Sequence, residues 1–438
     1  MRPSPSPVAS VPPAAARPVR EGVMLLTLAA VQFTHIMDFM IMMPLGSHLM
    51  RIFEINPGQF SRLVAAYGMS AAVTGFVAGI FLDYIPRRRA LLFLYAGFVV
   101  STLGCALAPT HHWLLVARIV AGAFGGVAGS VVTAMVGDVI PVERRGRGMA
   151  VVGAAFPLAS ILGLPAGLML VSAFGWHAVF VLLAALSSCV WVLAWRALPQ
   201  VPVQVATQHP LRQMREMLTH RVHLRGFVLT AVLIWGGASV APFMAPSMVA
   251  NVGFSEKQLS WIYLFGGAAT FLTTYCFGWL SDRFDKVLVL ACVSVFTIST
   301  ILYITRMGPT PVPLALIVTT LFFVTMSGRF APSMTMVANA VESRYRGGFM
   351  SVNSAIQQAS GAMANIVAGW FMTKEAATGR LLGYDRVGLM ATAAFVLTVA
   401  AAAWLRAAAP WAARNPRIGK KRTLAASGPV PPPSCPEA

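Results

Sequence analysis

Apolar residues along this chain gather into about twelve runs of roughly 20 residues, and short polar segments separate the runs. At a rise of 1.5 Å per residue, each run is long enough to cross the ~30 Å hydrocarbon core of a bilayer as an α-helix. The pattern therefore predicts an all-α polytopic membrane protein. Its twelve transmembrane helices are expected over residues 23–48, 59–82, 90–109, 113–137, 147–173, 177–198, 225–250, 258–281, 287–305, 312–340, 347–373 and 386–407.

The composition agrees with this prediction and excludes an ordinary soluble enzyme. Of the 438 residues, 57% are hydrophobic and 11% are charged, whereas about a quarter of the residues in soluble domains are charged. The first apolar run is longer than the core of a signal peptide and lacks a cleavage pattern, so we expect it to be retained. The five cysteines show no metal-ligand spacing, and we expect neither a metal nor a cofactor.

Two tails and one long connection divide the chain. Residues 1–20 and 409–438 are rich in Pro, Ala, Ser and Arg, and we expect both tails to be disordered and cytoplasmic. The longest connection, 199–224, contains three prolines and several basic residues. We interpret it as a cytoplasmic linker between an N-terminal six-helix bundle at 21–198 and a C-terminal six-helix bundle at 225–408.

The two six-helix segments carry the same short signatures at an offset of 199 residues. Gly79 and Asp83 follow the second predicted helix, and Gly278 and Asp282 follow the eighth. A second set precedes the fifth and eleventh helices, where Glu143, Arg145, Arg147 and Gly148 recur as Glu342, Arg344, Arg346 and Gly347. The shared offset indicates two parallel repeats, an arrangement in which the bundles are related by an axis along the membrane normal.

The basic residues outnumber the acidic ones by 33 to 14, and their distribution carries topological information. If the N-terminus is cytoplasmic, 24 basic residues lie in cytoplasmic segments, seven lie in outer loops, and Arg118 and Arg329 lie within helices. This asymmetry obeys the positive-inside rule and predicts that both termini are cytoplasmic. The basic C-terminal tail has Trp411 as its one aromatic residue, so we expect it to contact anionic lipid rather than nucleic acid.

The loop after the second predicted helix reads Gly-Ile-Phe-Leu-Asp-Tyr-Ile-Pro-Arg-Arg. It resembles the G-x-L-a-D-R-x-G-R-R signature of the major facilitator superfamily, with Tyr84 and Pro86 in place of the family's Arg and Gly. The resemblance covers residues 21–408 and implies two six-helix bundles that rock around a central cavity. It also implies a charge relay that holds an inner gate closed, formed by Gly79, Asp83, Arg87 and Arg88 in the first copy and Gly278, Asp282, Arg283 and Lys286 in the second.

Ionisable residues inside the predicted spans are candidates for proton coupling. Gln32, His35 and Asp38 repeat every three residues and so share one face of the first helix. Arg118, in an element similar to the family's R-x-x-x-G, lies at a similar depth, and a guanidinium in a span is costly unless it is paired. The run from Asp38 to Gly46 resembles helix 1 of arabinose-efflux-permease-like and drug:proton antiporter-like members. We interpret Asp38, His35 and Arg118 as a proton-coupling site; the alternatives are a purely structural ion pair and a polar lining histidine.

Other polar and glycine-rich positions are candidates for the cavity and for a hinge. Gly163, Pro165 and Gly167 resemble the antiporter-associated G-P-x-x-G element, and they predict either a hinge or seal in the fifth helix or close helix packing. Asn353, Gln357, Gly361 and Asn365 recur every four residues and either line a path or join two helices by hydrogen bonds. We interpret Gln32, Arg329, Asn353 and Gln357 as candidate substrate-cavity residues.

These patterns favour one function over its rivals. We expect proton-coupled efflux of a small drug-like or sugar-like molecule that is neutral or mildly amphipathic, carried out by a monomer in a bacterial inner membrane. The alternatives are an uptake permease or uniporter of the same fold and a transport-inactive sensor or scaffold. An intramembrane enzyme is disfavoured because the sequence contains no H-E-x-x-H, G-x-S-x-G or P-loop motif. The expected partners are therefore the transported molecule, protons and the lipid bilayer.

Overall fold

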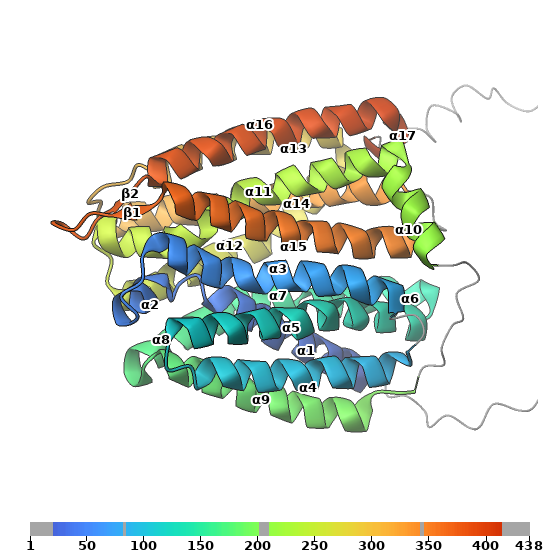
Figure 1. Cartoon of the computed structure of the whole chain (residues 1–438). Coiled ribbons are helices and arrows are strands. Elements are labelled where there is room, and N and C mark those ends of the chain that lie inside the picture. Colours follow the sequence, from blue (N-terminus) through green and yellow to red (C-terminus); the bar gives the residue numbers. More distant parts are fainter. Residues whose placement is uncertain (1–20, 82–84, 201–209, 342–345, 414–438) are drawn as a thin grey trace, which may run out of the picture.

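The computed structural model describes residues 21–81, 85–200, 210–341 and 346–413, which form a bundle of long helices running side by side (Figure 1). Ten segments within these ranges are long and apolar enough to cross a membrane. Two further long helices, α12 (Glu256–Arg283) and α15 (Arg346–Phe371), lie in the same bundle. The predicted all-α polytopic fold is confirmed.

The helices of the two halves follow one another with short connections. The first half contains α1 (Glu21–Ile41), α2 (Gly46–Ile52), α3 (Pro57–Phe81), α4 (Arg87–Ala106), α5 (His111–Val139), α6 (Val142–Gly153), α7 (Ala155–Leu158), α8 (Leu164–Phe174) and α9 (Trp176–Ala197). The second half contains α10 (Pro210–Thr219), α11 (Arg221–Ser247), α12, α13 (Lys286–Ile304), α14 (Val312–Asn339), α15, the strands β1 (Thr373–Lys374) and β2 (Leu381–Leu382), α16 (Tyr384–Ala408) and α17 (Pro410–Ala413).

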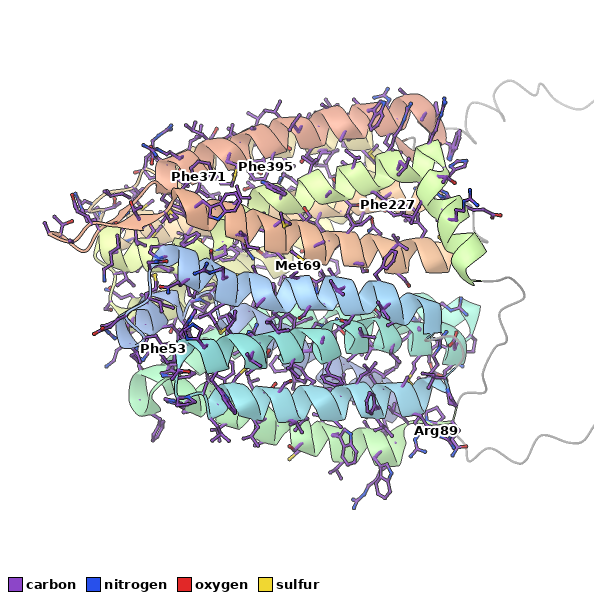
Figure 2. The ribbon with its side chains drawn as sticks, in the orientation of Figure 1. Phe53, Met69, Arg89, Phe227, Phe371 and Phe395 are labelled. Carbon is purple, nitrogen blue, oxygen red and sulfur yellow. The ribbon has the colours of Figure 1, made fainter. Side chains whose placement is uncertain are left out.

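The bundle has two distinct ends. The antiparallel hairpin of β1 and β2 lies with α2 at one end, which we call the hairpin end (Figure 1). The start of α1, the helix α10 and the helix α17 lie at the other end, which we call the termini end. Figure 2 shows Phe53 and Phe371 toward the hairpin end and Arg89 at the termini end. Each long helix runs from one end to the other.

Prolines interrupt two helices that the sequence pattern predicts as continuous. The helix expected over 23–48 ends at Ile41 and resumes as α2 beyond Pro44. The helix expected over 147–173 begins earlier, at Val142, and contains a π-helical segment at Ala159–Gly163, directly before Pro165. Proline has no N–H to donate to the preceding turn, and its ring clashes with that turn. A break in the helix or a wider π-helical turn avoids the clash.

Three segments differ from the predicted linker, tail and loops. The expected linker 199–224 contains α10, and α11 already begins at Arg221. The tail expected to be disordered from residue 409 begins with α17, in which Ala412 and Ala413 are fully buried because the short helix packs on α14 and α16. The hairpin of β1 and β2 was expected to be a loop. The remaining tail residues, 1–20 and 414–438, lie outside the described ranges.

The two halves pack against each other through α3 with α15 and through α8 with α12. Near the hairpin end, α3 and α15 approach so closely that a Cβ atom on Gly369 would lie 2.0 Å from Ser61 Oγ. Further along α3, toward the termini end, Gly75 and Gly79 have open space beside them. The contact between the halves is therefore tightest at the hairpin end.

An ion pair and a neighbouring histidine reinforce this closed end. Glu256, at the start of α12, pairs with Arg51 of α2, with 2.9 Å between Oε1 and Nη2. Its Oε2 atom also lies 3.4 Å from His48 Nδ1. These contacts join the first half to the second, and we call the three residues the hairpin-end latch.

Candidate functional site

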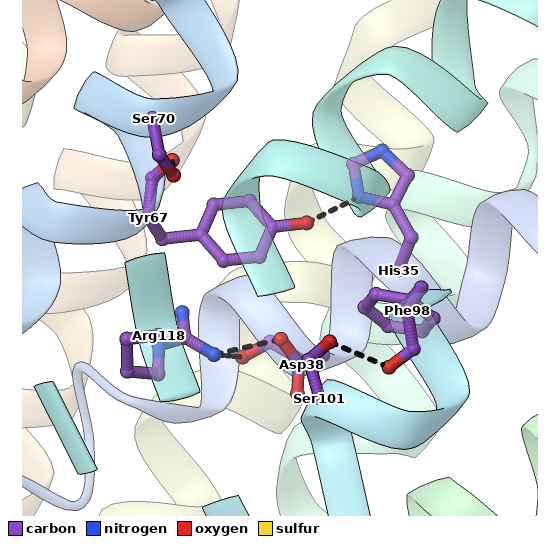
Figure 3. Close-up of polar contacts among 7 residues, drawn as sticks. All are labelled: His35, Asp38, Tyr67, Ser70, Phe98, Ser101 and Arg118. Atoms are coloured by element: carbon purple, nitrogen blue, oxygen red, sulfur yellow. Dashed lines mark hydrogen bonds and ion pairs between the residues drawn. The ribbon is translucent and has the colours of Figure 1, made fainter. Parts of the chain in front are cut away.

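The central feature of the first half is a fully buried ion pair between Asp38 of α1 and Arg118 of α5 (Figure 3). Arg118 Nη1 lies 2.7 Å from Asp38 Oδ2 and also donates to the Asp38 carbonyl at 3.2 Å. Both side chains have no exposed surface. The similar depths predicted for the two residues are confirmed.

Tyr67 of α3 forms one wall of this site. The Arg118 guanidinium carbon lies 4.6 Å from the centroid of the Tyr67 ring, within the range of a cation–π interaction. Gly122, one turn after Arg118, permits this approach, because a Cβ atom there would lie 2.2 Å from the Tyr67 carbonyl oxygen. The glycine of the R-x-x-x-G element thus brings α5 and α3 together at the ion pair.

His35 extends the polar site along α1. Its Nδ1 atom lies 3.1 Å from the Tyr67 hydroxyl, and the two rings are stacked (Figure 3). On α5, a Cβ atom at Gly129 would lie 3.0 Å from His35 Nε2 and 3.3 Å from Gln32 Oε1. The shared face of Gln32, His35 and Asp38 is therefore confirmed, and it turns toward α5. The Tyr67 ring stands between the ion pair and His35.

The buried pair is not fully satisfied by hydrogen bonds. Within the described ranges, Asp38 Oδ1 and Arg118 Nε and Nη2 have no hydrogen-bond partner. The Thr102 hydroxyl lies beside the carboxyl and the Cys105 thiol lies beside the guanidinium, but neither has the geometry of a hydrogen bond. A buried ion pair stabilises a fold only when its remaining donors and acceptors are also paired. The presence of this pair is therefore weak evidence for a purely structural role.

The described residues contain no group of three His, Cys, Asp or Glu side chains that could hold a metal ion. The polar groups of the site are the ion pair, the Tyr67 hydroxyl and His35. A carboxyl beside a cation can hold or release a proton, and the His35 imidazole, further along the same face of α1, lies within hydrogen-bond distance of the Tyr67 hydroxyl.

The cavity candidates of the second half lie apart from this site. Arg329 of α14 is buried and stacks on the Phe395 ring of α16, 3.8 Å from its centroid. Asn353 of α15 is buried, and Gln357 Nε2 lies 3.9 Å from Met334 Sδ of α14. The structure thus places these three candidates on α14 and α15, and the fourth candidate, Gln32, on α1.

The candidate hinge packs directly behind the ion pair. A Cβ atom on Gly163 would lie 2.6 Å from Met37 Sδ, and one on Gly167 would lie 2.9 Å from Ile41 Cδ1. Pro165, between them, begins the regular helix α8 after the π-helical segment. The glycines therefore let this segment of the fifth span contact the same turns of α1 that carry Asp38.

The first duplicated loop connects helices of one half. Arg87 Nε lies 3.1 Å from Asp138 Oδ2 of α5, and Arg88 donates to the Trp195 carbonyl of α9. Asp83 lies outside the described residues, and Gly79 has open space beside it. The pattern did not indicate Asp138, because a single carboxylate at the end of an apolar span does not reveal its partner.

The second duplicated loop is built differently. Asp285 caps α13 by accepting from the backbone N–H groups of Val287 and Leu288, and it pairs with Arg406 at 3.2 Å. The Arg283 guanidinium lies 5.0 Å from the Trp279 ring centroid. The remaining members differ in exposure: Asp282 is exposed, Lys286 is buried, and Gly278 has open space beside it.

Two parts of the site were missed by the sequence analysis. Tyr67 lies in an apolar helix, where an aromatic residue gives no sign of a functional role. The hairpin-end latch joins Arg51 and Glu256, which are 205 positions apart in the chain. The Ser255–Gln258 capping box marks the start of α12 but contains no information about a contact with α2.

Comparisons with known proteins identify the family. Residues 28–364 and 226–431 match the model of the Major Facilitator Superfamily, so the chain belongs to this family of transporters. It is 28% identical over 221 residues to YfhI of Bacillus subtilis, an uncharacterised transporter of the same type; the match covers 50% of this chain and 55% of YfhI, about half of each protein. It is 22% identical to a Helicobacter pylori protein named as a probable sugar efflux transporter, over 59% of this chain and 66% of that protein.

A solved structure supports the same fold. A bacterial homologue of the human lysosomal transporter Spinster superposes with a TM-score of 0.66 at 16% identity, over 95% of this chain and all of that one. Together, the family match and the fold establish a multi-pass integral membrane transporter of a small molecule. Family membership also supports the expectation that the protein is a transporter rather than an enzyme.

Proposed function

We propose that this member of the major facilitator superfamily carries out proton-coupled efflux of a small molecule, with Asp38 as the residue that binds the coupled proton. The observation that carries the proposal is the fully buried pair of Asp38 and Arg118, with 2.7 Å between the charged atoms. The names of the sugar efflux relatives support efflux and a sugar-like substrate, and a drug-like molecule is the other substrate class in this proposal.

The environment of Asp38 supplies two opposing forces that a coupling site needs. Burial favours the neutral acid, whereas the nearby guanidinium of Arg118 favours the carboxylate. A movement that separates the two side chains, or that admits water from one end, shifts the balance and binds or releases a proton. In this proposal His35 extends the route for the proton along α1, with its Nδ1 atom 3.1 Å from the Tyr67 hydroxyl.

The halves supply the movement in this proposal. We assign residues 21–198 and 225–408 to two bundles that rock against each other, exposing the site to one end at a time. The hairpin-end latch and the contact of Ser61 with Gly369 support a state that is closed at the hairpin end. Asp83 and Asp282 would hold the termini end together in the opposite state.

The orientation follows from the basic residues. Basic side chains at the termini end of long helices include Arg144, Arg196 and Arg283, whereas those at the hairpin end include Arg51 and Lys257. This arrangement agrees with the split of 24 to seven and supports a cytoplasmic termini end. We therefore propose a monomer in the cell inner membrane that exports its substrate from the termini end to the hairpin end.

Counterflow in proteoliposomes tests the proposal. The full-length protein is reconstituted, and uptake of radiolabelled sugars and drugs is measured with and without an imposed pH gradient. If transport of a substrate is coupled to protons, we expect that substrate to accumulate inside the proteoliposomes only when the pH gradient is present. Equal accumulation with and without the gradient would show facilitated transport and overturn the proposal of proton coupling.

A further inference from the structure

Arg329 is a buried cation in the second half of the protein, and it has no ion-pair partner among the described residues. Its side chain is 1% exposed, and it lies 17 residues after the start of α14 and ten before its end. These positions are about 26 Å and 15 Å from the two ends of the helix. Among the described residues, no charged side chain acts on Arg329, whereas Arg118 is balanced by Asp38. A cation at this depth without a counter-ion is costly, and such residues mark functional sites.

The contacts of the Arg329 guanidinium hold the group in place but leave some of its N–H donors without acceptors. One face stacks on Phe395, which Figure 2 shows on α16. The Nη2 atom lies 2.9 Å from Met326 Sδ, a weak acceptor. In the described part of the chain, Nε and Nη1 have no partner, and these atoms carry three of the five N–H donors of a guanidinium. The group is thus oriented and still available to bind an acceptor.

Two further unpartnered polar groups lie on α11 and α14, which pack against each other. A Cβ atom on Gly237 would meet Met326, and one on Gly226 would meet Val337. The same antiparallel register places Thr230 of α11 opposite Ser333, one turn from Arg329 on α14. Both hydroxyls are completely buried and have no hydrogen-bond partner in the described ranges. Donors from two helices therefore gather at one level of the second half.

We propose that Arg329, with the hydroxyls of Thr230 and Ser333, forms a binding site for the carboxylate of an amphipathic organic acid. A guanidinium recognises a carboxylate by charge and by directed N–H donors, and the Phe395 and Met326 side chains offer an apolar surface to the rest of the molecule. The site is closed in this structure, so a ligand enters when α11 moves against α14. The inference rests on the proposed transport function and names its substrate class.

This assignment revises the neutral substrate expected from the sequence. That expectation considered Asp38, Arg118, Arg329 and His35 together. In the structure, Asp38 and Arg118 neutralise each other within the first half. The positive charge of Arg329 in the second half is therefore the surplus charge of the described mid-span residues, and it selects an anion.

Ligand-induced stabilisation tests the site without requiring transport. The purified full-length protein is heated with benzoate, octanoate or gluconate, and each is compared with its neutral amide. We expect at least one carboxylate to raise the melting temperature while its amide does not. Arg329→Met should weaken the binding of that carboxylate by roughly tenfold to hundredfold, since a hydrogen bond to a charged group is lost. Arg306→Gln, which removes an exposed cation of the same half, is the control and should respond like the wild type.

The melting temperatures of the wild type and of Arg329→Met without ligand distinguish a binding role of Arg329 from a structural one. If Arg329 is kept for binding, Arg329→Met removes an unbalanced buried charge and should raise the melting temperature while the carboxylate response is lost. If Arg329 is structural, the variant melts lower and keeps the response, which would overturn the inference. A wild type that responds to none of the three carboxylates, or equally to their amides, would overturn it as well. Asp38→Asn should keep the carboxylate response, so failure of proton coupling and failure of this site give different results.

Discussion

The substitution Asp38→Asn removes the charge of the buried carboxyl but keeps the shape of the side chain. Asparagine occupies nearly the same volume, but it cannot carry the negative charge that faces Arg118 Nη1 at 2.7 Å. The guanidinium then remains in a fully buried position without a counter-ion. The variant should therefore lose both stability and proton coupling, and the two losses must be separated.

The size of the stability loss follows from the burial of the pair. Removing one partner of a buried ion pair costs about 3–5 kcal/mol, because the other charge is left uncompensated. The double variant Asp38→Asn with Arg118→Gln removes both charges, and such replacements are often neutral or stabilising. We therefore expect the double variant to regain most of the stability that the single variant loses.

A surface ion pair provides the matched control. Asp285 and Arg406 lie 3.2 Å apart, with side chains that are 31% and 52% exposed. Breaking an exposed pair costs about 1 kcal/mol or less. Asp285→Asn also keeps the N-cap of α13, because asparagine caps a helix as well as aspartate. This variant should retain stability, transport and pH dependence.

Two assays on the same proteoliposomes measure both effects. Thermal unfolding reports stability, and substrate accumulation with and without a pH gradient reports coupling. We expect Asp38→Asn and the double variant to lose gradient-driven accumulation while exchange without a gradient continues. A double variant that is stable and still accumulates substrate with the wild-type pH dependence would refute the reasoning. The pair would then be structural, and the proton would bind elsewhere.

Three further predictions follow from individual contacts. Glu256→Gln removes the charge that pairs with Arg51 and lies beside His48 in the hairpin-end latch, and it should increase labelling of a cavity cysteine from the hairpin end; unchanged labelling would exclude a gating role. Gly129→Ala places a Cβ atom 3.0 Å from His35 Nε2 and should change the pH profile of transport, whereas Gly137→Ala, on the same helix with open space beside it, should leave the profile unchanged. Asp282→Asn should raise labelling of the same cysteine from the termini end, and equal accessibility in variant and wild type would contradict the proposed inner gate.

The sequence predicts those features that depend on one helix at a time. Run length and polarity place the membrane spans, and the three-residue repeat of Gln32, His35 and Asp38 places their shared face. The pairing of Asp38 with Arg118 follows from depth, because a buried charge requires a partner at the same level. Each of these inferences uses only the periodicity and the length of a helix.

Contacts between helices that do not involve a buried charge escape such reasoning. Tyr67 becomes part of the site only because Gly122 brings α5 onto α3. Arg51 and Glu256 meet because the two halves close at the hairpin end. The burial of Ala412 likewise reflects packing on α14 and α16, although the composition of the tail as a whole favours disorder. A single sequence contains no direct information on which helix faces are neighbours.

Charge counting sets a condition on the proposed exchange of a proton for an organic acid. With Asp38 ionised, the charges of Asp38, Arg118 and Arg329 sum to +1, and protonation of Asp38 raises the sum to +2. A carboxylate at Arg329 is therefore attracted more strongly when Asp38 is protonated, so electrostatics alone favour carrying both in the same direction. Exchange in opposite directions requires that the two sites load from opposite ends in turn. The two residues lie in different halves and at different levels, Asp38 three residues before α1 ends and Arg329 ten residues before α14 ends, and separate loading requires such a separation.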